Sequence, residues 1–245
     1  MEEETEEHNH TGGFEAFAVN LASEMRGPIG ILVEYSRLLM NEPSEALSVL
    51  QRQHVETIHS AAQHVYALNR DLVDVSRLTT GKMRLHLDDI DLEMVLREVV
   101  ARYEAVDLDK PVPVQTDVTP NLPAVRADLS RVRQVLSTLL GFAVSCAVSC
   151  DVRGIDVRLG LEPTENPPMV HISIVCRQCD LSEICSPDSL ALLSGHDPLP
   201  SLKMSSYNLF VARSIVDLHG GRIWVDIDPQ SGSTIQLTLP VWEHG

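Results

Sequence analysis

The chain has 245 residues, a formal net charge of -16 and 44% hydrophobic residues. This length is enough for one or two domains with a buried core. The acidic balance argues against binding to nucleic acid or to an anionic membrane surface, because either would repel the chain. No apolar run approaches the roughly 20 residues of a membrane-spanning helix, and the acidic start differs from a signal peptide. Five cysteines, an odd number, fit a reducing compartment better than a disulfide framework, so we expect a cytoplasmic protein without membrane insertion.

Two long helices are predicted in the first third of the chain. Residues 14–40 carry apolar side chains at alternating steps of three and four, and residues 44–78, with Ser44 as the candidate N-cap, continue such a seam. The seam positions are Phe14, Phe17, Leu21, Pro28, Ile31, Tyr35 and Leu38 in the first helix, and Ile58, Ala61, Val65, Leu68, Leu72 and Val75 in the second.

Two antiparallel helices with one narrow apolar stripe each cannot cover themselves. The economical solution is a four-helix bundle made by two copies of the chain, which predicts a homodimer through residues 14–78. The alternative is a hairpin that packs on its own C-terminal domain. Residues 1–13 are acidic and lack apolar periodicity, so we expect a disordered arm there.

From residue 81 onwards the pattern changes to an α/β domain. The predicted helices cover residues 91–103 (capped by Asp91), 128–150 and 208–219. The predicted strands cover residues 82–87, 112–116, 124–127, 155–161, 169–176, 222–228 and 234–240, and residues 177–206 are predicted to be irregular. Three helices on one mixed sheet make a two-layer sandwich. The predicted fold class is therefore α+β, with an acidic arm (1–13), a helical hairpin (14–80) and an α/β domain (81–245).

The first predicted helix contains the run Ala22-Ser23-Glu24-Met25-Arg26-Gly27-Pro28-Ile29. This run is similar to the phosphoacceptor box of the sensor histidine kinases, usually Ser-His-Glu-Leu-Arg-Thr-Pro-Leu, but Ser23 replaces the histidine. Residues 74–82, 128–136 and 219–225, and the later Gly232-Ser233-Thr234, resemble the family in the same order. The resemblance covers roughly residues 14–242. It implies a dimerisation hairpin followed by an ATP-binding domain of the gyrase and Hsp90 type.

The family's nucleotide-binding positions differ in this chain. Thr138 and Phe142 stand where the N box of the family has two asparagines, and the second asparagine holds Mg²⁺, for which a phenyl ring offers no oxygen ligand. We interpret Phe142 as a core residue that fills the pocket. Cys176 replaces the aspartate that binds adenine. The family's glycines are replaced by Gln178 and Asp180 in the following box and by Met204, Ser206 and Asn208 in the lid.

These losses together predict a chain that binds neither ATP nor Mg²⁺ and has no catalytic residue. A serine hydroxyl needs stronger activation than an imidazole, and its phosphoester is too stable to pass on readily. The resemblance implies that Ser23, Glu24 and Arg26 form a surface for a response-regulator receiver domain or a partner histidine kinase. We therefore predict a catalytically inactive, histidine-kinase-like scaffold in a two-component-type pathway. The alternative is a divergent active histidine kinase or phosphotransferase, for which His64 is a further phosphoacceptor to test.

The cysteines are a weaker signal. Cys176 and Cys179 have the C-x-x-C spacing, with Cys185 six residues further on. A zinc or redox site is compatible with this group, but a second ligand pair with the right spacing is missing. We interpret these three as core or incidental thiols, and Cys146 and Cys150 as small buried residues of an apolar helix.

Overall fold

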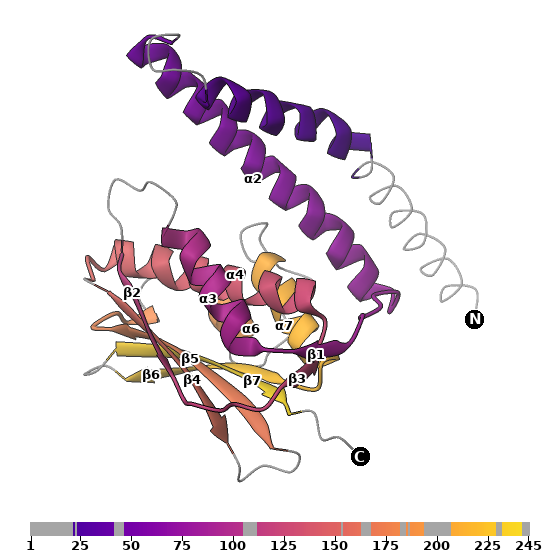
Figure 1. Ribbon diagram of the computed structural model, residues 1–245, viewed down its shortest axis with the longest axis vertical. Coiled ribbons are helices and arrows are strands. Elements are labelled where there is room, and N and C mark those ends of the chain that lie inside the picture. Colours follow the sequence, from indigo (N-terminus) through magenta and orange to yellow (C-terminus); the bar gives the residue numbers. More distant parts are fainter. Residues whose placement is uncertain are drawn as a thin grey trace. The chain divides into compact units, whose positions relative to one another are not determined.

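The computed structural model describes residues 22, 24–41, 47–104, 112–152, 154–162, 168–181, 185, 187–193, 207–228 and 232–241 (Figure 1). The predicted disordered arm, residues 1–13, lies outside these ranges. The chain divides into two compact units, Met1–Met83 and Arg84–Gly245.

The first unit is a helical hairpin. Residues 24–40 form one helix, and α2 (Val49–Thr79) forms the other. Two hydrogen bonds join them in antiparallel order: the Ser36 hydroxyl lies 2.9 Å from Nδ1 of His59, and the Arg52 guanidinium donates to the Met40 carbonyl at 2.9 Å. The predicted hairpin is thus confirmed (Figure 1).

The start of α2 differs from the prediction. Ser48 caps the helix, because its hydroxyl accepts from the Gln51 N–H while the Gln51 side chain accepts from the Ser48 N–H. This reciprocal pair satisfies two backbone donors that a helix end leaves free. The predicted cap, Ser44, lies outside the described residues, and a helix beginning there is wrong by about one turn.

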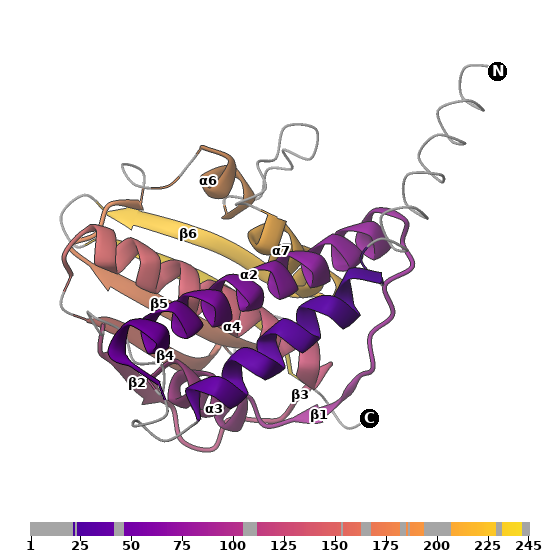
Figure 2. The same cartoon turned by 90° about the horizontal axis from the view of Figure 1, so that it is seen from above.

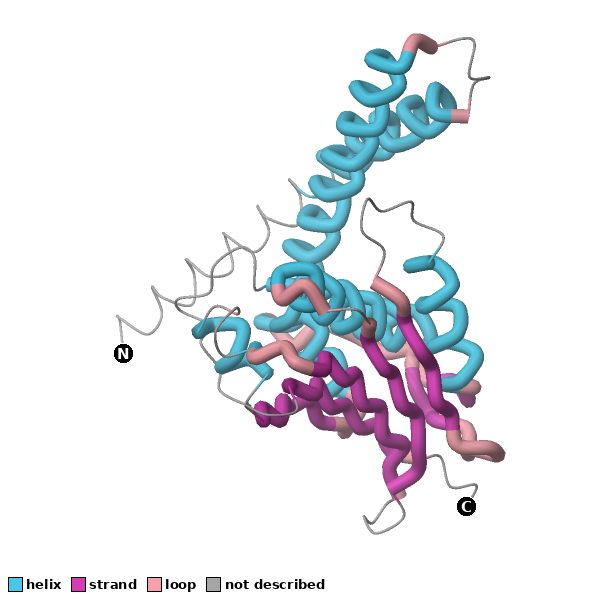
Figure 3. Tube along the Cα trace, turned by 90° about the vertical axis from the view of Figure 1, so that its left-hand side faces the viewer, coloured by secondary structure: helices cyan, strands magenta, loops and turns pink. Residues whose placement is uncertain are grey.

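The second unit is a two-layer α/β sandwich. A five-stranded sheet has the order β2-β4-β5-β7-β6, in which β2 and β4 are parallel and the other pairs antiparallel. β1 and β3 form a separate antiparallel pair. The helices α3, α4 and α7 cover one face of the sheet (Figure 3). The elements are β1 (Asp88–Ile90), α3 (Leu92–Glu104), β2 (Val114–Val118), β3 (Val125–Ala127), α4 (Leu129–Ser149), β4 (Ile155–Glu162), β5 (Met169–Arg177), α6 (Pro187–Leu193), α7 (Tyr207–Leu218), β6 (Arg222–Asp228) and β7 (Gly232–Pro240). The α+β class is confirmed.

One predicted strand is wrong. Residues 82–87 alternate in polarity, but the first described strand after the hairpin is β1. The N–H groups of Lys82 and Met83 both donate to the Arg77 carbonyl at the end of α2, at 2.8 and 3.1 Å. The N–H of His86 donates to a carboxylate oxygen of Asp128 at 3.0 Å. The N–H groups of Lys82, Met83 and His86 are therefore bonded to a helix-end carbonyl and to a side-chain carboxylate, so they are not available to pair with a neighbouring strand.

A short helix was missed in the segment predicted to be irregular. α6 begins at Pro187, where the fixed φ of proline suits the first helical position and its missing N–H costs nothing. The prediction took this proline as a sign of a loop. α6 and α7 lie near β6, at the edge of the sheet (Figure 2).

The helix α4 is the core element of the second unit. It is the one described helix that is long and apolar enough to cross a membrane by length and composition, and half of that stretch is buried inside the protein. Its buried side chains recur every three or four residues from Val132 to Ala147. This burial is the pattern of a core helix that packs on a sheet.

Asp128, the N-cap of α4, joins two segments on which the family resemblance rests. Its carboxylate accepts hydrogen bonds from the Arg131 N–H (3.1 Å), the Ser130 hydroxyl (2.8 Å) and the His86 N–H (3.0 Å). Burial alone would raise the pKa of Asp128, but these bonds outweigh it and hold the pKa below its usual value. The Asp128 N–H in turn donates to Nε2 of buried His219 at 3.0 Å.

His219 is held neutral by this arrangement. Because Nε2 accepts from Asp128, the proton sits on Nδ1, which donates to the Ile215 carbonyl at 2.7 Å. Burial lowers the pKa of His219, although the Ile215 carbonyl and the Asp128 charge act in the opposite direction. A proton on Nε2 would break the bond to Asp128.

We therefore expect the second unit to lose stability as the pH falls below about 6.5, the usual histidine pKa. In that range the unfolded chain binds a proton that the folded His219 resists, so the free energy of unfolding falls with pH. Between pH 7.5 and 5.5 the loss is up to about 1.4 kcal/mol, measured by urea denaturation. His219→Gln should be less stable but should lack this loss, whereas the control His86→Gln, at an exposed side chain, should keep it. An equal loss in His219→Gln would refute the assignment.

Candidate functional site

The predicted partner surface lies on the first helix of the hairpin. Glu24 and Arg26 are both exposed on it. Ser23, the residue at the phosphoacceptor position, lies outside the described residues, as does the side chain of His64. The structure therefore places two of the three predicted partner-binding residues at the surface.

Part of the seam predicted for the dimer is exposed in the single chain, whereas Leu68 and Val75 are half-buried and Phe14, Phe17 and Leu21 lie outside the described residues. On the first helix Ile31 is 59% exposed, Tyr35 65% and Leu38 50%. On α2 the seam residues Ile58, Val65 and Leu72 are exposed as well. Within the described part of the chain, these large apolar side chains at heptad spacing thus remain exposed, which is the pattern of an interface.

The inside of the hairpin uses a different set of residues. On the first helix the buried residues are Ala22, Ile29 and Ser36, at steps of seven. On α2 they include Val55, Ala62, Asn69 and Ser76, again at steps of seven. This inner seam is composed mainly of small and polar side chains, so the larger apolar residues are left for contacts outside the hairpin.

One of the positions predicted for a degenerate nucleotide site, Cys176, lies against α4, the helix that carries Thr138 and Phe142. Cys176, near the end of β5, is fully buried, and its sulfur lies 3.9 Å from the Ala143 carbonyl of α4. Thr138 and Phe142 lie four residues apart on the same helix and are half-buried. Phe142, interpreted from the sequence as a core residue, is therefore only partly buried.

The two replaced glycine positions after β5 differ in their surroundings. Gln178 has φ +59°, a left-handed backbone conformation that glycine adopts without penalty and other residues rarely adopt. The backbone therefore retains a conformation suited to the family's glycine, although the residue has changed. Asp180 is half-buried.

Few of the lid positions are described. Met204 and Ser206 lie outside the described residues. Asn208 is exposed in the first turn of α7, where its side-chain oxygen accepts a hydrogen bond from the Leu209 N–H at 2.9 Å. Within the described part of the chain, no three or more His, Cys, Asp or Glu side chains are grouped so that they could hold a metal ion.

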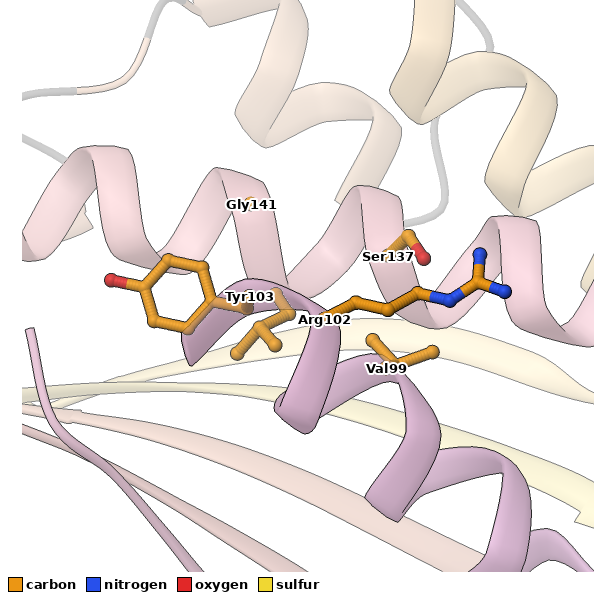
Figure 4. A pocket seen from close by; sticks show the side chains of 6 residues that line it. Val99, Arg102, Tyr103, Ser137 and Gly141 are labelled. Carbon is orange, nitrogen blue, oxygen red and sulfur yellow. The ribbon is translucent and has the colours of Figure 1, made fainter. Parts of the chain in front are cut away.

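A groove that the sequence did not indicate lies between α3 and α4 (Figure 4). It has a volume of about 180 Å³ and is lined by Val99, Arg102, Tyr103, Ser137, Leu140 and Gly141. Ser137 and Gly141 each precede a predicted nucleotide position, so they lie about 100° around the helix from Thr138 and Phe142. The groove is thus distinct from that site, and it is smaller than the roughly 300–1,000 Å³ of typical ligand pockets. In the sequence, the groove is accompanied by two small residues four positions apart on α4, Ser137 and Gly141.

Comparison with known proteins identifies relatives along nearly the whole chain. The "Non-motile and phage-resistance protein" of Caulobacter vibrioides is 28% identical in an alignment 241 residues long that covers 92% of this chain and 27% of that protein. The "Adaptive-response sensory kinase SasA" of Prochlorococcus marinus is 29% identical in an alignment 231 residues long that covers 91% of this chain and 58% of that protein. The chain thus spans less than two thirds of either relative. No protein-family model matches it.

Solved structures show the same fold. Full-length ShkA in complex with AMPPNP superposes with a TM-score of 0.67 at 22% identity, over 94% of this chain and 46% of that one. The Acinetobacter baumannii histidine kinase AdeS superposes with a TM-score of 0.54 at 18% identity, over 90% of this chain and 98% of that one. The solved structures show that the chain has the fold of histidine kinases, and the sequence relatives, at 28% and 29% identity, support its resemblance to the sensor histidine kinase family.

Proposed function

We propose that the chain is a non-catalytic, histidine-kinase-like scaffold of two-component signalling in the cytoplasm, which dimerises through its hairpin. It binds a response-regulator receiver domain or a partner histidine kinase and takes no ATP or Mg²⁺. The observation that carries the proposal is the packing of Cys176, whose fully buried sulfur contacts α4 where the family places its adenine-binding aspartate.

The chemistry of the neighbouring positions supports the loss of nucleotide binding. A thiol packed on a carbonyl offers adenine no carboxylate acceptor. Phe142, which is half-buried, offers Mg²⁺ no oxygen. Gln178 adds a side chain at a turn where close approach of backbone to a ligand favours glycine.

The hairpin supports the binding role. The exposed Glu24 and Arg26 flank Met25, an exposed apolar residue that lies outside the seam predicted for the dimer. Apolar anchors with charged neighbours are the composition of a protein interface. In the family, receiver domains dock around this helix, so we propose the same surface here.

Titration of the purified chain with Mg-ATP by calorimetry tests the proposal. We expect no binding heat up to millimolar nucleotide. The dissociation constant for Mg-ATP would then lie at least about 100-fold above the micromolar range, a difference of about 3 kcal/mol in binding free energy. An active histidine kinase domain in the same buffer is the control. Micromolar, metal-dependent binding would instead support the divergent-kinase alternative, and mass spectrometry would then be used to seek phosphate on Ser23 or His64.

A further inference from the structure

All five cysteines of the chain gather in one region of the second unit. Cys146 lies on α4, Cys150 caps its C-terminus, and Cys176 lies near the end of β5. Cys179 and Cys185 follow β5 and precede α6. All five are free thiols. Thiols from separate elements thus converge, which the interpretation as incidental residues does not explain.

The thiols form pairs. The sulfurs of Cys146 and Cys185 lie 3.7 Å apart. Cys150 lies close enough to Cys179 to raise the pKa of its thiol. Because the described residues hold no cluster of three or more metal-ligating side chains, this paired arrangement fits disulfide formation better than tetrahedral metal binding.

Both ends of the first pair are anchored. Cys146 is buried on α4. The Cys185 N–H donates to the carbonyl of Leu181 at 3.0 Å, and the N–H of fully buried Leu181 donates to the Ser233 hydroxyl at 3.1 Å. That hydroxyl donates to the Cys179 carbonyl at 2.8 Å. Leu181, whose carbonyl accepts from the Cys185 N–H, is therefore tied to β7, so the fold holds the two sulfurs near each other.

We propose that Cys146 and Cys185 form a redox-active thiol pair, which a hydroperoxide converts into a disulfide that joins α4 to the segment before α6. The two sulfurs, 3.7 Å apart, must move about 1.7 Å closer to reach the disulfide bond length of about 2.0 Å. The bridge would connect residues 39 positions apart in the sequence.

The two thiols have different reactivities. The hydrogen bond between the two thiols lowers the pKa of Cys185, although burial acts in the opposite direction. The same bond, with burial, raises the pKa of Cys146. Cys185 is also only half-buried, so the accessible member of the pair is the one that more readily forms the nucleophilic thiolate.

The reaction proceeds in two balanced steps. The Cys185 thiolate attacks one oxygen of the hydroperoxide, the O–O bond breaks, and the sulfur becomes a sulfenic acid while the leaving oxygen takes a proton from water. The Cys146 sulfur then attacks the Cys185 sulfur, the S–O bond breaks, and the hydroxide leaves with the Cys146 proton as water. Two thiols are oxidised by two electrons, and one hydroperoxide is reduced to an alcohol (or water) plus water.

The second pair, Cys150 and Cys179, provides a comparison for the rate of oxidation. Cys179 is fully buried, and burial raises its pKa, with the neighbouring Cys150 thiol acting in the same direction. Cys150 and Cys179 should therefore react more slowly with a hydroperoxide than Cys146 and Cys185 do.

The test treats the fully reduced, full-length chain with hydrogen peroxide and then counts free thiols and maps disulfides by mass spectrometry. We expect the loss of two of the five thiols, a peptide cross-link between Cys146 and Cys185, and full reversal by dithiothreitol. Cys185→Ser should lower the oxidation rate at least about tenfold. Cys146→Ser should leave a sulfenic acid on Cys185 that dimedone traps.

Cys150→Ser is the matched control and should lose two thiols at the wild-type rate. Circular dichroism measures whether each variant folds. If Cys146→Ser does not fold, the variant Cys185→Ser, at the half-buried thiol, still provides the test. A cross-link between Cys150 and Cys179, no loss of thiols, or stoichiometric zinc in the purified chain would each overturn the proposal.

Discussion

Gly221→Ala is expected to lower the free energy of unfolding of the second unit by about 3 kcal/mol or more, because the turn after α7 leaves no room for a methyl group. A Cβ at this position would lie 2.0 Å from the Thr238 carbonyl oxygen and 2.9 Å from a methyl carbon of Val216. The oxygen belongs to the backbone of β7, which pairs with both β5 and β6. The clash therefore cannot be relieved by rotating a side chain.

Urea denaturation followed by circular dichroism measures this loss. Gly141→Ala is the matched control, because Gly141 lies on α4 and a methyl group added there would meet nothing within 4 Å. Since alanine favours a helix over glycine, this control should raise the free energy of unfolding by about 0.5–1 kcal/mol. A Gly221→Ala variant as stable as the wild type would show that the turn and β7 do not pack this closely.

This contrast illustrates what the sequence can predict about the fold. The pair Gly220-Gly221 marks the end of α7, and Asp128 marks the start of α4, because caps are set by a few local residues. Gly220, with φ +74°, is the left-handed residue that a helix end favours. The reason for Gly221 is a contact with Thr238, far along the chain. That contact is visible only once β6 and β7 are paired.

The departures from the predictions have the same origin. The alternation of residues 82–87 is a local strand signal, but the N–H of His86 is taken by Asp128, 42 residues away. Phe142 is a large apolar residue on a buried helix, yet its position on α4 leaves it half-buried. Sequence pattern predicts which elements form, whereas the partners of individual groups depend on tertiary packing.

The candidate site could be predicted only in part, because the sequence pattern does not show which side chains come into contact. The resemblance places Cys176 beside the N-box helix, and the structure brings its sulfur against Ala143. The convergence of Cys146 with Cys185 could not be read from their spacing, because C-x-x-C was the conspicuous pattern and neither residue belongs to it. Only the fold places these two thiols side by side.

The double variant Ile31→Lys with Tyr35→Lys is expected to convert the proposed dimer into a monomer. Both side chains are exposed in the single chain, at 59% and 65%, and lie on the seam predicted for the bundle. In a symmetric dimer each change occurs twice, and losing the burial of one large apolar side chain costs about 1.5–3 kcal/mol. The dimer dissociation constant should therefore rise at least about 100-fold, as measured by light scattering over a concentration series.

A lysine placed outside the seam tests whether the loss of the dimer is specific to the seam residues. Val49→Lys is the matched control, because Val49 is 78% exposed at the start of α2 but lies outside the seam. This variant should remain dimeric, and all variants should keep the helical content of the wild type, since the inner seam of Ala22, Ile29 and Ser36 is unchanged. A wild-type chain that is monomeric at micromolar concentration would favour the alternative, a hairpin that packs on its own second unit. A double variant that stays dimeric would place the interface elsewhere on the chain.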